Sequence, residues 1–464
     1  MFTTATGMQE LGSGQNFLRA TLAFTLSLAA CHSNASSLPS IAPNSAQSAA
    51  SQSRIVKLTL GITHTQHSLD SWGNAASVVR GEAVLRATTV VQNQSIMGWG
   101  ATNPEPYPNR YVWSDLDRRI ALMRRTRAVM QLTLCCAPDW MKGGKPGTTN
   151  WNRLAVAPYP AHYKDFAALA VAIARRYPDV KQFAVWNELK GFWDRKLNRW
   201  NYEAYTSLYN DVYDALKAVS PDIAVGGPYV SFDEYLHAQS NPSPVHGPYG
   251  RIDQRDLDVI TYWLAHKHGA DFITFDAGTA ARDGNPPDWF TATQVYSDLD
   301  RWVAARTSLP IHWAEWYSSK YASSGNGVLF DHARQDAQSS ATLVAMASSG
   351  ASVELRWQPQ GDDCCGYQGD QESVWSDTLV AKGGKAFPFS ATLAAFRRAF
   401  PPGTALIDIK TPDTDASILA SVNTLMVVNG LPYSRSITVN GRRISVVPFG
   451  VVFLSQPSLF QRSP

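Results

Sequence analysis

The sequence predicts an α/β protein, a (β/α)8 TIM barrel followed by a small C-terminal antiparallel β-sandwich. Two observations lead to this fold class. Eight runs of apolar and β-rich residues alternate with segments of helical periodicity between residues 54 and 400. These runs are apolar almost throughout, which is typical of parallel strands that are buried on both faces. Eight successive strand–helix units favour a closed barrel over an open, doubly wound sheet.

The elements of the predicted barrel follow one another along the chain. The predicted strands occupy residues 55–62, 84–91, 128–135, 181–186, 222–227, 271–276, 309–315 and 352–357. The predicted helices occupy residues 70–81, 113–126, 162–177, 201–219, 253–268, 291–306, 331–348 and 390–400. The helix over 201–219 has the clearest pattern, because apolar residues recur from Tyr205 at the i, i+3, i+4 and i+7 spacing of one helix face.

Beyond the barrel, the pattern changes to short strands. Residues 401–464 contain several β-rich segments, and the pairs Asn429-Gly430 and Asn440-Gly441 are strong hairpin signals. This piece is too short to bury much core of its own. We therefore expect it to be an accessory sandwich that packs on the barrel of residues 54–400.

Composition excludes several classes of protein. The chain is 44% hydrophobic and 17% charged, which is ordinary for a globular protein and excludes a fibrous or wholly disordered one. The net charge is +3 without long single-sign runs, so nothing indicates nucleic-acid binding. The absence of a phosphate-binding glycine loop and of a His-x-x-x-His pattern predicts no cofactor and no metal. The 15 tryptophans suit either core packing or stacking on sugar rings.

The first 31 residues are expected to direct export. Residues 21–30 form an apolar run after Arg19 that is too short to span a bilayer but suits a signal peptide. The run ends in Leu28-Ala-Ala-Cys31, which resembles a bacterial lipobox and would make Cys31 a lipidation site; ordinary cleavage nearby is the alternative. Residues 32–53 are rich in Ser, Ala, Asn and Pro and are expected to be a flexible linker. The predicted location is periplasmic or cell-surface, with a membrane tether.

The remaining four cysteines occur as two adjacent pairs. Cys135-Cys136 follows the third predicted strand and Cys364-Cys365 follows the eighth. Neither pair has the spacing of a metal site. In an exported protein these cysteines can form disulfides, whose connectivity the sequence leaves open, and buried free thiols are the alternative. We expect at least the 364/365 pair to be oxidised.

Two glutamates lie where the chemistry of a barrel is found. Glu188 follows the fourth predicted strand and Glu315 ends the seventh, and the active sites of such barrels lie at the C-terminal ends of the strands. One carboxyl group alone at a strand end is usually solvated or ion-paired. Two that face one cavity from opposite strands are what cleavage of a glycosidic bond requires, one as proton donor and one as nucleophile or base.

The residues around both glutamates resemble those of clan A retaining glycoside hydrolases, most closely family 39. The Trp-Asn-Glu that ends at Glu188 resembles the acid/base motif of this family, and the Glu-Trp-Tyr that begins at Glu315 resembles its nucleophile motif. The resemblance implies that Glu188 is the acid/base, that Glu315 is the nucleophile and that Asn187 binds the 2-hydroxyl of the sugar. The chain departs from the family at Leu189-Lys190, where many relatives have Pro-Asn, and at Asp276, where a His or Tyr is expected.

The same resemblance extends over most of residues 54–460 and suggests further substrate-binding positions. Arg86 resembles the arginine at the rim end of the second strand, where it would hold Glu315 ionised; an ordinary ion pair is the alternative. We also expect contacts with the sugar from five other residues, each with a structural role as its alternative. They are His64, Trp140, Asp276, Tyr317 and Trp357, with His67 and Trp313 as weaker candidates.

The sequence thus predicts an exported retaining glycoside hydrolase that acts on an oligo- or polysaccharide. Two alternatives remain open. The same pair of glutamates could transfer the sugar to an acceptor other than water, as in a transglycosylase. The chain could also be a glycan-binding lipoprotein without catalysis, although a binding protein does not need two opposed carboxylates. The sugar, the linkage, endo or exo action and the oligomeric state are not determined by the sequence.

Overall fold

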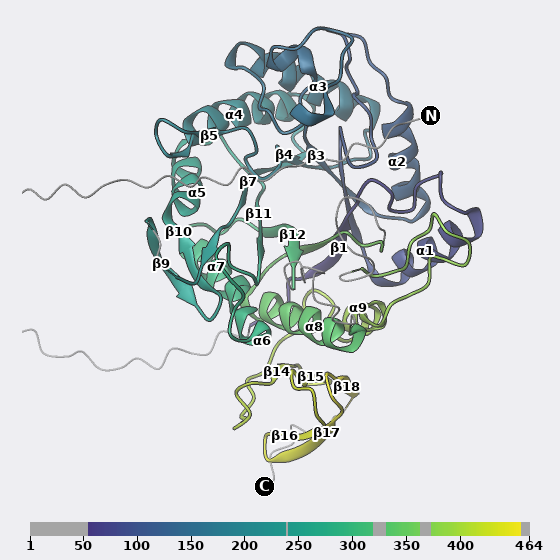
Figure 1. Ribbon diagram of the computed structural model, residues 1–464, viewed down its shortest axis with the longest axis vertical. Coiled ribbons are helices and arrows are strands. Elements are labelled where there is room, and N and C mark those ends of the chain that lie inside the picture. The colour runs from purple at the N-terminus through teal and green to yellow at the C-terminus, as the bar shows by residue number, and fades with distance from the viewer. Residues whose placement is uncertain (1–53, 238–239, 319–330, 362–372, 456–464) are drawn as a thin grey trace, which may run out of the picture. The chain divides into compact units, whose positions relative to one another are not determined.

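The computed structural model describes residues 54–237, 240–318, 331–361 and 373–455. Its centre is a closed barrel of eight parallel strands in the order β1-β2-β3-β4-β7-β11-β12-β13 (Figure 1). The strands are β1 (Thr59–Thr63), β2 (Val91–Ser95), β3 (Val129–Leu134), β4 (Gln182–Val185), β7 (Ala224–Ser231), β11 (Phe272–Gly278), β12 (Ile311–Tyr317) and β13 (Val353–Trp357). Nearly every strand residue is buried. The predicted barrel fold is therefore confirmed.

Helices surround the barrel between successive strands (Figure 1). They are α1 (Ala75–Thr88), α2 (Ser114–Arg125), α3 (Tyr163–Arg176), α4 (Tyr202–Val219), α5 (Gln254–His266), α6 (Trp289–Ala292), α7 (Gln294–Ala304), α8 (His332–Ser349) and α9 (Pro388–Ala399). In α4, Asn201 caps the first turn through the backbone N–H of Ala204, and the face that contains Tyr205 is buried, as its spacing predicts. In the part of the chain that the structure covers, no helix combines the length and the apolar character needed to cross a membrane.

The predicted strand over residues 84–91 is wrong. Helix α1 covers most of this segment, and β2 begins only at Val91. The helix is capped by Asn74 and buries Gly81, Leu85 and Thr88, which lie three or four residues apart on one face. Arg86 consequently lies on a helix outside the barrel, where it forms an i,i+4 ion pair with Glu82 at 3.3 Å. It is not the rim arginine that the sequence predicted.

The loops that follow the strands carry short additional elements. Three 3₁₀ turns follow β3, namely η1 (Asp139–Lys142), η2 (Trp151–Arg153) and η3 (Pro160–His162). A small hairpin of β5 (Trp193–Asp194) and β6 (Arg199–Trp200) follows β4. An antiparallel sheet of β8 (Glu234–Tyr235), β9 (Pro242–Gly247) and β10 (Gly250–Asp253) follows β7. These elements extend the C-terminal rim of the barrel.

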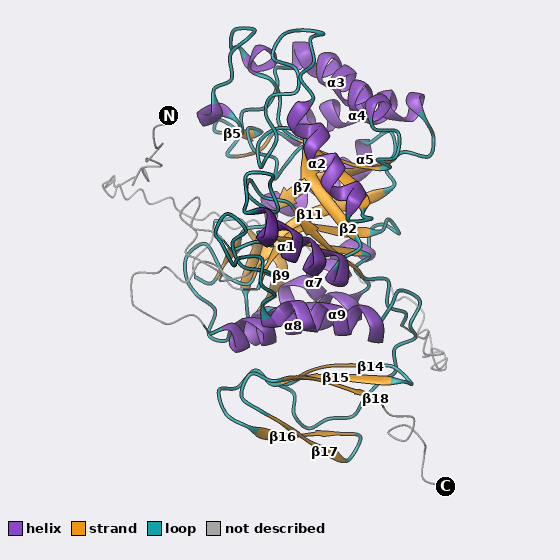
Figure 2. Ribbon diagram, turned by 90° about the vertical axis from the view of Figure 1, so that its right-hand side faces the viewer, coloured by secondary structure: helices purple, strands orange, loops and turns teal. Residues whose placement is uncertain are grey.

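The C-terminal segment forms two small antiparallel sheets below α8 and α9 (Figure 2). One sheet contains β14 (Ser417–Ala420), β15 (Thr424–Val428) and β18 (Val451–Ser455), and the other contains β16 (Arg435–Val439) and β17 (Arg442–Val446). Their facing residues, such as Leu425, Ile437 and Val446, form a core between the sheets. Leu419 and Met426 belong instead to the main barrel core, so the sandwich packs on the barrel.

The two Asn-Gly pairs of this segment behave differently. Asn440 and Gly441 have φ angles of 50° and 82° and form the tight turn between β16 and β17, as predicted. Asn429-Gly430 does not form a hairpin, because β15 pairs with β14 and β18 and not with β16. The side chain of Asn429 is buried and donates hydrogen bonds to the backbone oxygens of Tyr433 and Val447. It bridges the two sheets.

Candidate active site

Three carboxylates converge at the C-terminal rim of the barrel. Glu188 follows β4, Asp276 lies near the end of β11 and Glu315 lies in β12. One oxygen atom from each of the three lies within 4.8 Å of the others. Glu315 and Asp276 are buried and Glu188 is partly exposed. The structure thus brings together the two glutamates and the aspartate that the sequence singled out.

A break in strand register places Asp276 beside Glu315. Phe275 pairs with Trp313, but the next residue, Asp276, pairs with Glu315, so that Ala314 is an extra residue in β12. Bulges of this kind redirect side chains and are common next to active sites. Without the extra residue, Asp276 and Glu315 would not share a position along the two strands.

The backbone that carries Glu188 has an unusual conformation. Trp186, Glu188 and Leu189 have φ angles of 71°, 48° and 44°, in the left-handed region that non-glycine residues seldom adopt. Such strain persists only where the surroundings fix it, and it is frequent at functional sites. Here the indole N–H of Trp186 donates to the backbone oxygen of Lys190 at 2.7 Å. The backbone N–H of Leu189 donates to the backbone oxygen of Tyr229 at 3.1 Å. The position of Glu188 is therefore held by buried contacts on both sides.

Glu315 is buried and is held by the hydroxyl of a tyrosine. Tyr317, for which the sequence predicts a contact with the sugar, donates a hydrogen bond from its hydroxyl to Oε2 of Glu315 at 2.8 Å. Burial, followed by the negative charge of Glu188, raises the pKa of Glu315 to about 8, although Lys190 and the hydroxyls of Tyr229 and Tyr317 oppose the shift. Glu315 is thus a carboxyl group whose ionisation falls near neutral pH.

Lys190 is a site residue that the sequence reasoning noticed only as a departure from the family motif. Its ammonium group forms an ion pair with Glu188 and lies 5.7 Å from the centre of the Trp99 ring. Burial disfavours its charge, but the charges of Glu188 and Glu315 outweigh burial and raise the pKa of Lys190. The site therefore contains one permanent cation directly beside the predicted acid/base.

Tyr229 is a second site residue that the sequence did not indicate. It lies in β7 with a φ of 45°, and its buried hydroxyl makes no hydrogen bond of ordinary geometry within the described residues. Burial and the negative charges of Glu315, Asp276 and Glu188 raise its pKa well above the usual value. The only available signal was its place near the end of a buried strand.

The three carboxylates are a poor cation site. They offer three converging oxygen positions, whereas Ca²⁺ takes six to eight ligands and Mg²⁺ about six. The ammonium group of Lys190 already supplies positive charge to Glu188. The cluster is better suited to proton transfer than to binding a metal.

Asn187 and Trp357 are neighbours of residues in the carboxylate cluster. Asn187 is buried, and the described residues provide no hydrogen-bond partner for its side-chain NH₂ group. Trp357 is half-buried at the end of β13, with its ring centre 5.6 Å from that of Tyr317. Because Tyr317 contacts Glu315, Trp357 belongs to the wall of the same site.

The structure gives two other tryptophans different roles. The indole N–H of Trp140 donates to the backbone oxygen of Glu105, and the ring packs edge-on against His162, so Trp140 braces the loop after β3. Trp313 is fully buried, and its N–H donates to Asp300 of α7. It therefore points toward the helices outside the barrel, and its predicted stacking role is wrong.

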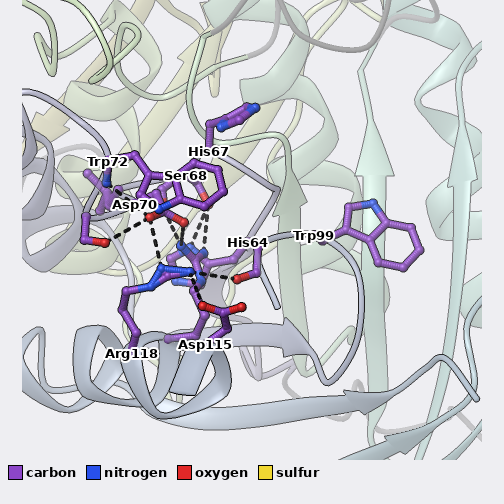
Figure 3. A network of polar contacts seen from close by, with 12 residues as sticks. His64, His67, Ser68, Asp70, Trp72, Trp99, Asp115 and Arg118 are labelled. Atoms are coloured by element: carbon purple, nitrogen blue, oxygen red, sulfur yellow. Dashed lines mark hydrogen bonds and ion pairs between the residues drawn. The ribbon is translucent and has the colours of Figure 1, made fainter. Parts of the chain in front are cut away.

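His64 belongs to a buried polar network and not to a substrate subsite (Figure 3). Its two ring nitrogens contact Ser68 Oγ at 2.9 Å and Gln92 Oε1 at 3.1 Å, and the side chain is 1% exposed. Burial, with the charge of Arg119, lowers its pKa well below the usual value. Since both nitrogens are engaged with the protein, the predicted contact between His64 and the sugar is wrong.

The same network fixes the chain that follows β1. The buried carboxylate of Asp70 pairs with Arg118 at 3.2 Å (Figure 3). It also pairs with Arg119 at 3.8 Å, and Arg119 donates to the backbone oxygen of Ser68. His67, at the edge of the network, packs against Trp72 with ring centres 6.1 Å apart. These contacts attach the β1 loop to α2.

Cys135 and Cys136 form a disulfide between adjacent residues directly after β3. Both side chains are buried. They lie alongside the strand end that carries Trp186, since the N–H of Trp186 donates to the oxygen of Leu134. Cys364 and Cys365, for which the sequence also predicts oxidation, lie outside the described residues.

The oxidation state of the cysteines can be counted directly. Titration of thiols in the denatured, unreduced protein after export should find fewer than four reactive groups among the two pairs. The observed Cys135–Cys136 bond removes two, and the predicted oxidation of Cys364-Cys365 would remove the others. Mass spectrometry of alkylated peptides would assign each pair. Four free thiols would contradict both the Cys135–Cys136 disulfide and the predicted oxidation of Cys364-Cys365.

Comparison with known proteins gives similarity at the level of the fold. No family model and no curated protein sequence matches this chain. A monomeric β-xylosidase from Caulobacter crescentus CB15 has 14% identity and a TM-score of 0.53 over 89% of this chain and 78% of its own. A glucosidase from Croceicoccus marinus has 14% identity and a TM-score of 0.50 over 88% and 82%. The catalytic domain of a family 30 xylanase C from Talaromyces cellulolyticus has 12% identity and a TM-score of 0.50 over 83% and 86%.

These neighbours agree in one respect: they are glycoside hydrolases. At this level of sequence identity, the similarity establishes the fold, and the reaction depends on the residues of the site. The chain has the barrel fold that clan A glycoside hydrolases share.

Proposed function

We propose that this protein is a retaining glycoside hydrolase. The observation that carries the proposal is the distance between Glu188 and Glu315, whose nearest carboxylate oxygens lie within 4.8 Å. Retaining enzymes separate their carboxyl groups by about 5–5.5 Å so that one can attack the sugar directly, whereas inverting enzymes leave about 6.5–9.5 Å for a water molecule. The shorter separation fits the pair in this protein.

The roles of the two glutamates follow from their surroundings. Glu315 accepts a hydrogen bond from Tyr317, which stabilises its ionised form as the nucleophile. Glu188 delivers a proton to the departing oxygen while Glu315 attacks the anomeric carbon and forms a glycosyl-enzyme. Glu188 then accepts a proton from water as the water attacks, and the sugar leaves with its original configuration.

The substrate class is an oligo- or polysaccharide. The half-buried Trp357 and the unpartnered NH₂ group of Asn187 provide an apolar face and a hydrogen-bond donor for a sugar ring. The neighbours that share the fold include a β-xylosidase, a glucosidase and a xylanase, which supports a glycan substrate without choosing one. A panel of aryl glycosides and bacterial or plant polysaccharides, with NMR of the first anomer released, would test both substrate and stereochemistry. If the first sugar released has the opposite anomeric configuration to the substrate, the proposal of a retaining enzyme is refuted.

Two alternatives are less well supported. A transglycosylase would use the same pair of glutamates, and products longer than the substrate would reveal it. A glycan-binding lipoprotein without catalysis would gain nothing from a strained backbone at Glu188 or from a buried carboxylate at Glu315. Crude polysaccharide can be incubated with the protein or with a Glu315→Ala variant. An enzyme should release sugar only in the first case, whereas a binding protein should release none in either.

The proposed location is the periplasm or the cell surface, with the protein tethered through a lipid on Cys31. Both the signal segment and Cys31 lie outside the described residues. A Cys31→Ala variant should appear in the soluble fraction, whereas the parent protein should partition with membranes. The reason is that a lipid chain contributes about 0.8 kcal/mol of membrane binding for each buried methylene. Immunoblots of the two fractions test this, and recovery of both proteins in the soluble fraction would leave simple secretion.

A further inference from the structure

Asp276 has an environment unlike that of the two glutamates around it. Its side chain is 1% exposed, and neither carboxylate oxygen has a hydrogen-bond partner of ordinary geometry among the described residues. Glu188, by contrast, is paired with Lys190, and Glu315 accepts a hydrogen bond from Tyr317. Asp276 is thus the one carboxyl group of the cluster with neither an ion pair nor a hydrogen bond of ordinary geometry among the described residues.

The charges of the cluster require that a proton remain in it. Three ionised carboxylates and one ammonium group would carry a net charge of −2 in a largely buried space, with one oxygen of each carboxylate within 4.8 Å of the others. Like charges so close in a site of low dielectric cannot all be ionised near neutral pH. When Glu315 is ionised as the nucleophile, the remaining proton belongs on the carboxyl group that has neither an ion pair nor a hydrogen bond of ordinary geometry, which is Asp276.

We propose that Asp276 holds the proton of the reactive site and supplies it to Glu188 during cleavage of the glycosidic bond. This inference rests on the proposed function. Asp276 acts through Glu188 and does not touch the scissile bond, so it is a positioning residue for the proton. Lys190 forms an ion pair with Glu188, whereas Asp276 has no ion pair among the described residues.

The proton balance of this scheme closes over one catalytic cycle. In the first step the departing oxygen takes a proton from Glu188, Glu188 takes the proton of Asp276, and Glu315 becomes an ester of the sugar. Asp276 is then ionised and Glu315 uncharged, so the cluster keeps a net charge of −1. In the second step water gives its proton to Glu188, which returns one to Asp276, and Glu315 is released as a carboxylate.

The groups that face Asp276 support this assignment. They are Tyr229 and Ser231 from β7, Glu315 and Tyr317 from β12, and Glu188 and Lys190 from the end of β4. Burial, followed by the charges of Glu188 and Glu315, raises the pKa of Asp276 well above its usual value, and the Ser231 hydroxyl opposes the shift. Because the carboxyl groups interact strongly, measured pKa values belong to the cluster as a whole.

The first test varies the leaving group of the substrate. Asp276→Asn keeps the size of the side chain and can donate an N–H to Glu188, but it has no proton to give. Hydrolysis of substrates with sugar or alkyl leaving groups, which need an acid, should fall by about 10²–10⁴-fold. Hydrolysis of substrates with activated aryl leaving groups should fall by less than about tenfold. An equal loss for all leaving groups would indicate a merely structural role and overturn the proposal.

A second variant distinguishes proton supply from loss of folding. In the double variant Asp276→Asn/Lys190→Met, the ammonium group that forms the ion pair with Glu188 is gone, so a proton on Glu188 no longer competes with that ion pair. Activity on the poor leaving groups should therefore recover by at least about tenfold relative to Asp276→Asn alone. A double variant that is less active than Asp276→Asn would contradict the scheme. Asp300→Asn, which removes a buried carboxyl group outside the site, is the matched control and should leave the leaving-group dependence unchanged.

A readout without substrate separates this inference from the proposed function. Because burial and the charges of Glu188 and Glu315 raise the pKa of Asp276 well above its usual value, Asp276 should keep its proton at a pH where ordinary carboxyl groups are ionised. The infrared band of a protonated carboxylic acid should then be smaller in Asp276→Asn than in the parent, and an unchanged band would overturn the inference. A parent protein that shows the band but cleaves no glycoside would instead overturn the proposed function, and proton supply with it.

Discussion

Glu315→Ala should be nearly inactive on every glycoside, whatever the leaving group. The variant has no nucleophile, so the glycosyl-enzyme cannot form, and loss of such a group costs roughly 10⁴–10⁶-fold in turnover. The measurement is kcat/KM on an activated aryl glycoside and on a natural glycan. Glu203→Ala, which removes an exposed glutamate from α4, is the control and should keep full activity.

Glu188→Ala should fail in a different way. Activated aryl glycosides need little proton donation, so the variant should form the glycosyl-enzyme from them at a substantial rate. It should then stall, because no base activates water. Azide needs no base and should relieve the stall, giving a glycosyl azide of retained configuration. A retained azide product from Glu315→Ala and an inverted one from Glu188→Ala would mean that the roles are exchanged. Full activity in both variants would remove the pair from the mechanism.

Glu315→Gln should unfold less readily than the parent protein near neutral pH, although it is inactive. The pKa of Glu315 is raised from an ordinary 4.5 to about 8. A carboxyl group with a raised pKa binds its proton more tightly in the folded state, so stability falls as pH rises from about 4.5 to about 8. At about pH 7 the shift corresponds to about 3 kcal/mol of lost stability, of which glutamine should restore a large part.

The dependence on pH distinguishes this effect from a change in packing. Below pH 4 the carboxyl group is protonated in both folded and unfolded states, so the variant and the parent should unfold at similar urea concentrations. Glu203→Gln is the matched control, because Glu203 has its pKa lowered by Arg199 and should gain nothing from neutralisation. A stability gain for Glu315→Gln that is equal at both pH values would contradict the assignment. The same shift predicts that the activity of the parent rises with pH as Glu315 ionises.

The sequence by itself was sufficient for the barrel and for the two glutamates. A parallel strand that is buried on both faces is apolar over its whole length, and such runs are visible without knowledge of their neighbours. A closed barrel brings the C-terminal ends of all its strands to one rim. The positions of Glu188 and Glu315 at two strand ends were therefore enough to predict that they face one site, and the structure places one oxygen of each within 4.8 Å of the other.

Local pattern was insufficient at the junction of α1 and β2. The segment around residues 84–91 contains enough β-branched residues to be read as a strand, but the cap at Asn74 and the burial of Leu85 against the barrel make most of it a helix. Because this segment was predicted as a strand, Arg86 was predicted at the rim, whereas it lies on a helix outside the barrel. Whether this segment forms a helix or a strand depends on which of its faces is buried. Burial is decided by packing against elements that are distant in the sequence.

Only the tertiary structure decided the electrostatics of the site. The bulge at Ala314, which aligns Asp276 with Glu315, depends on the register between β11 and β12, and no local pattern encodes it. The ion pair of Lys190 with Glu188 depends on the left-handed turn of the chain after β4. Charges interact through distance and burial, and both arise only when strands that are far apart in the sequence are brought together.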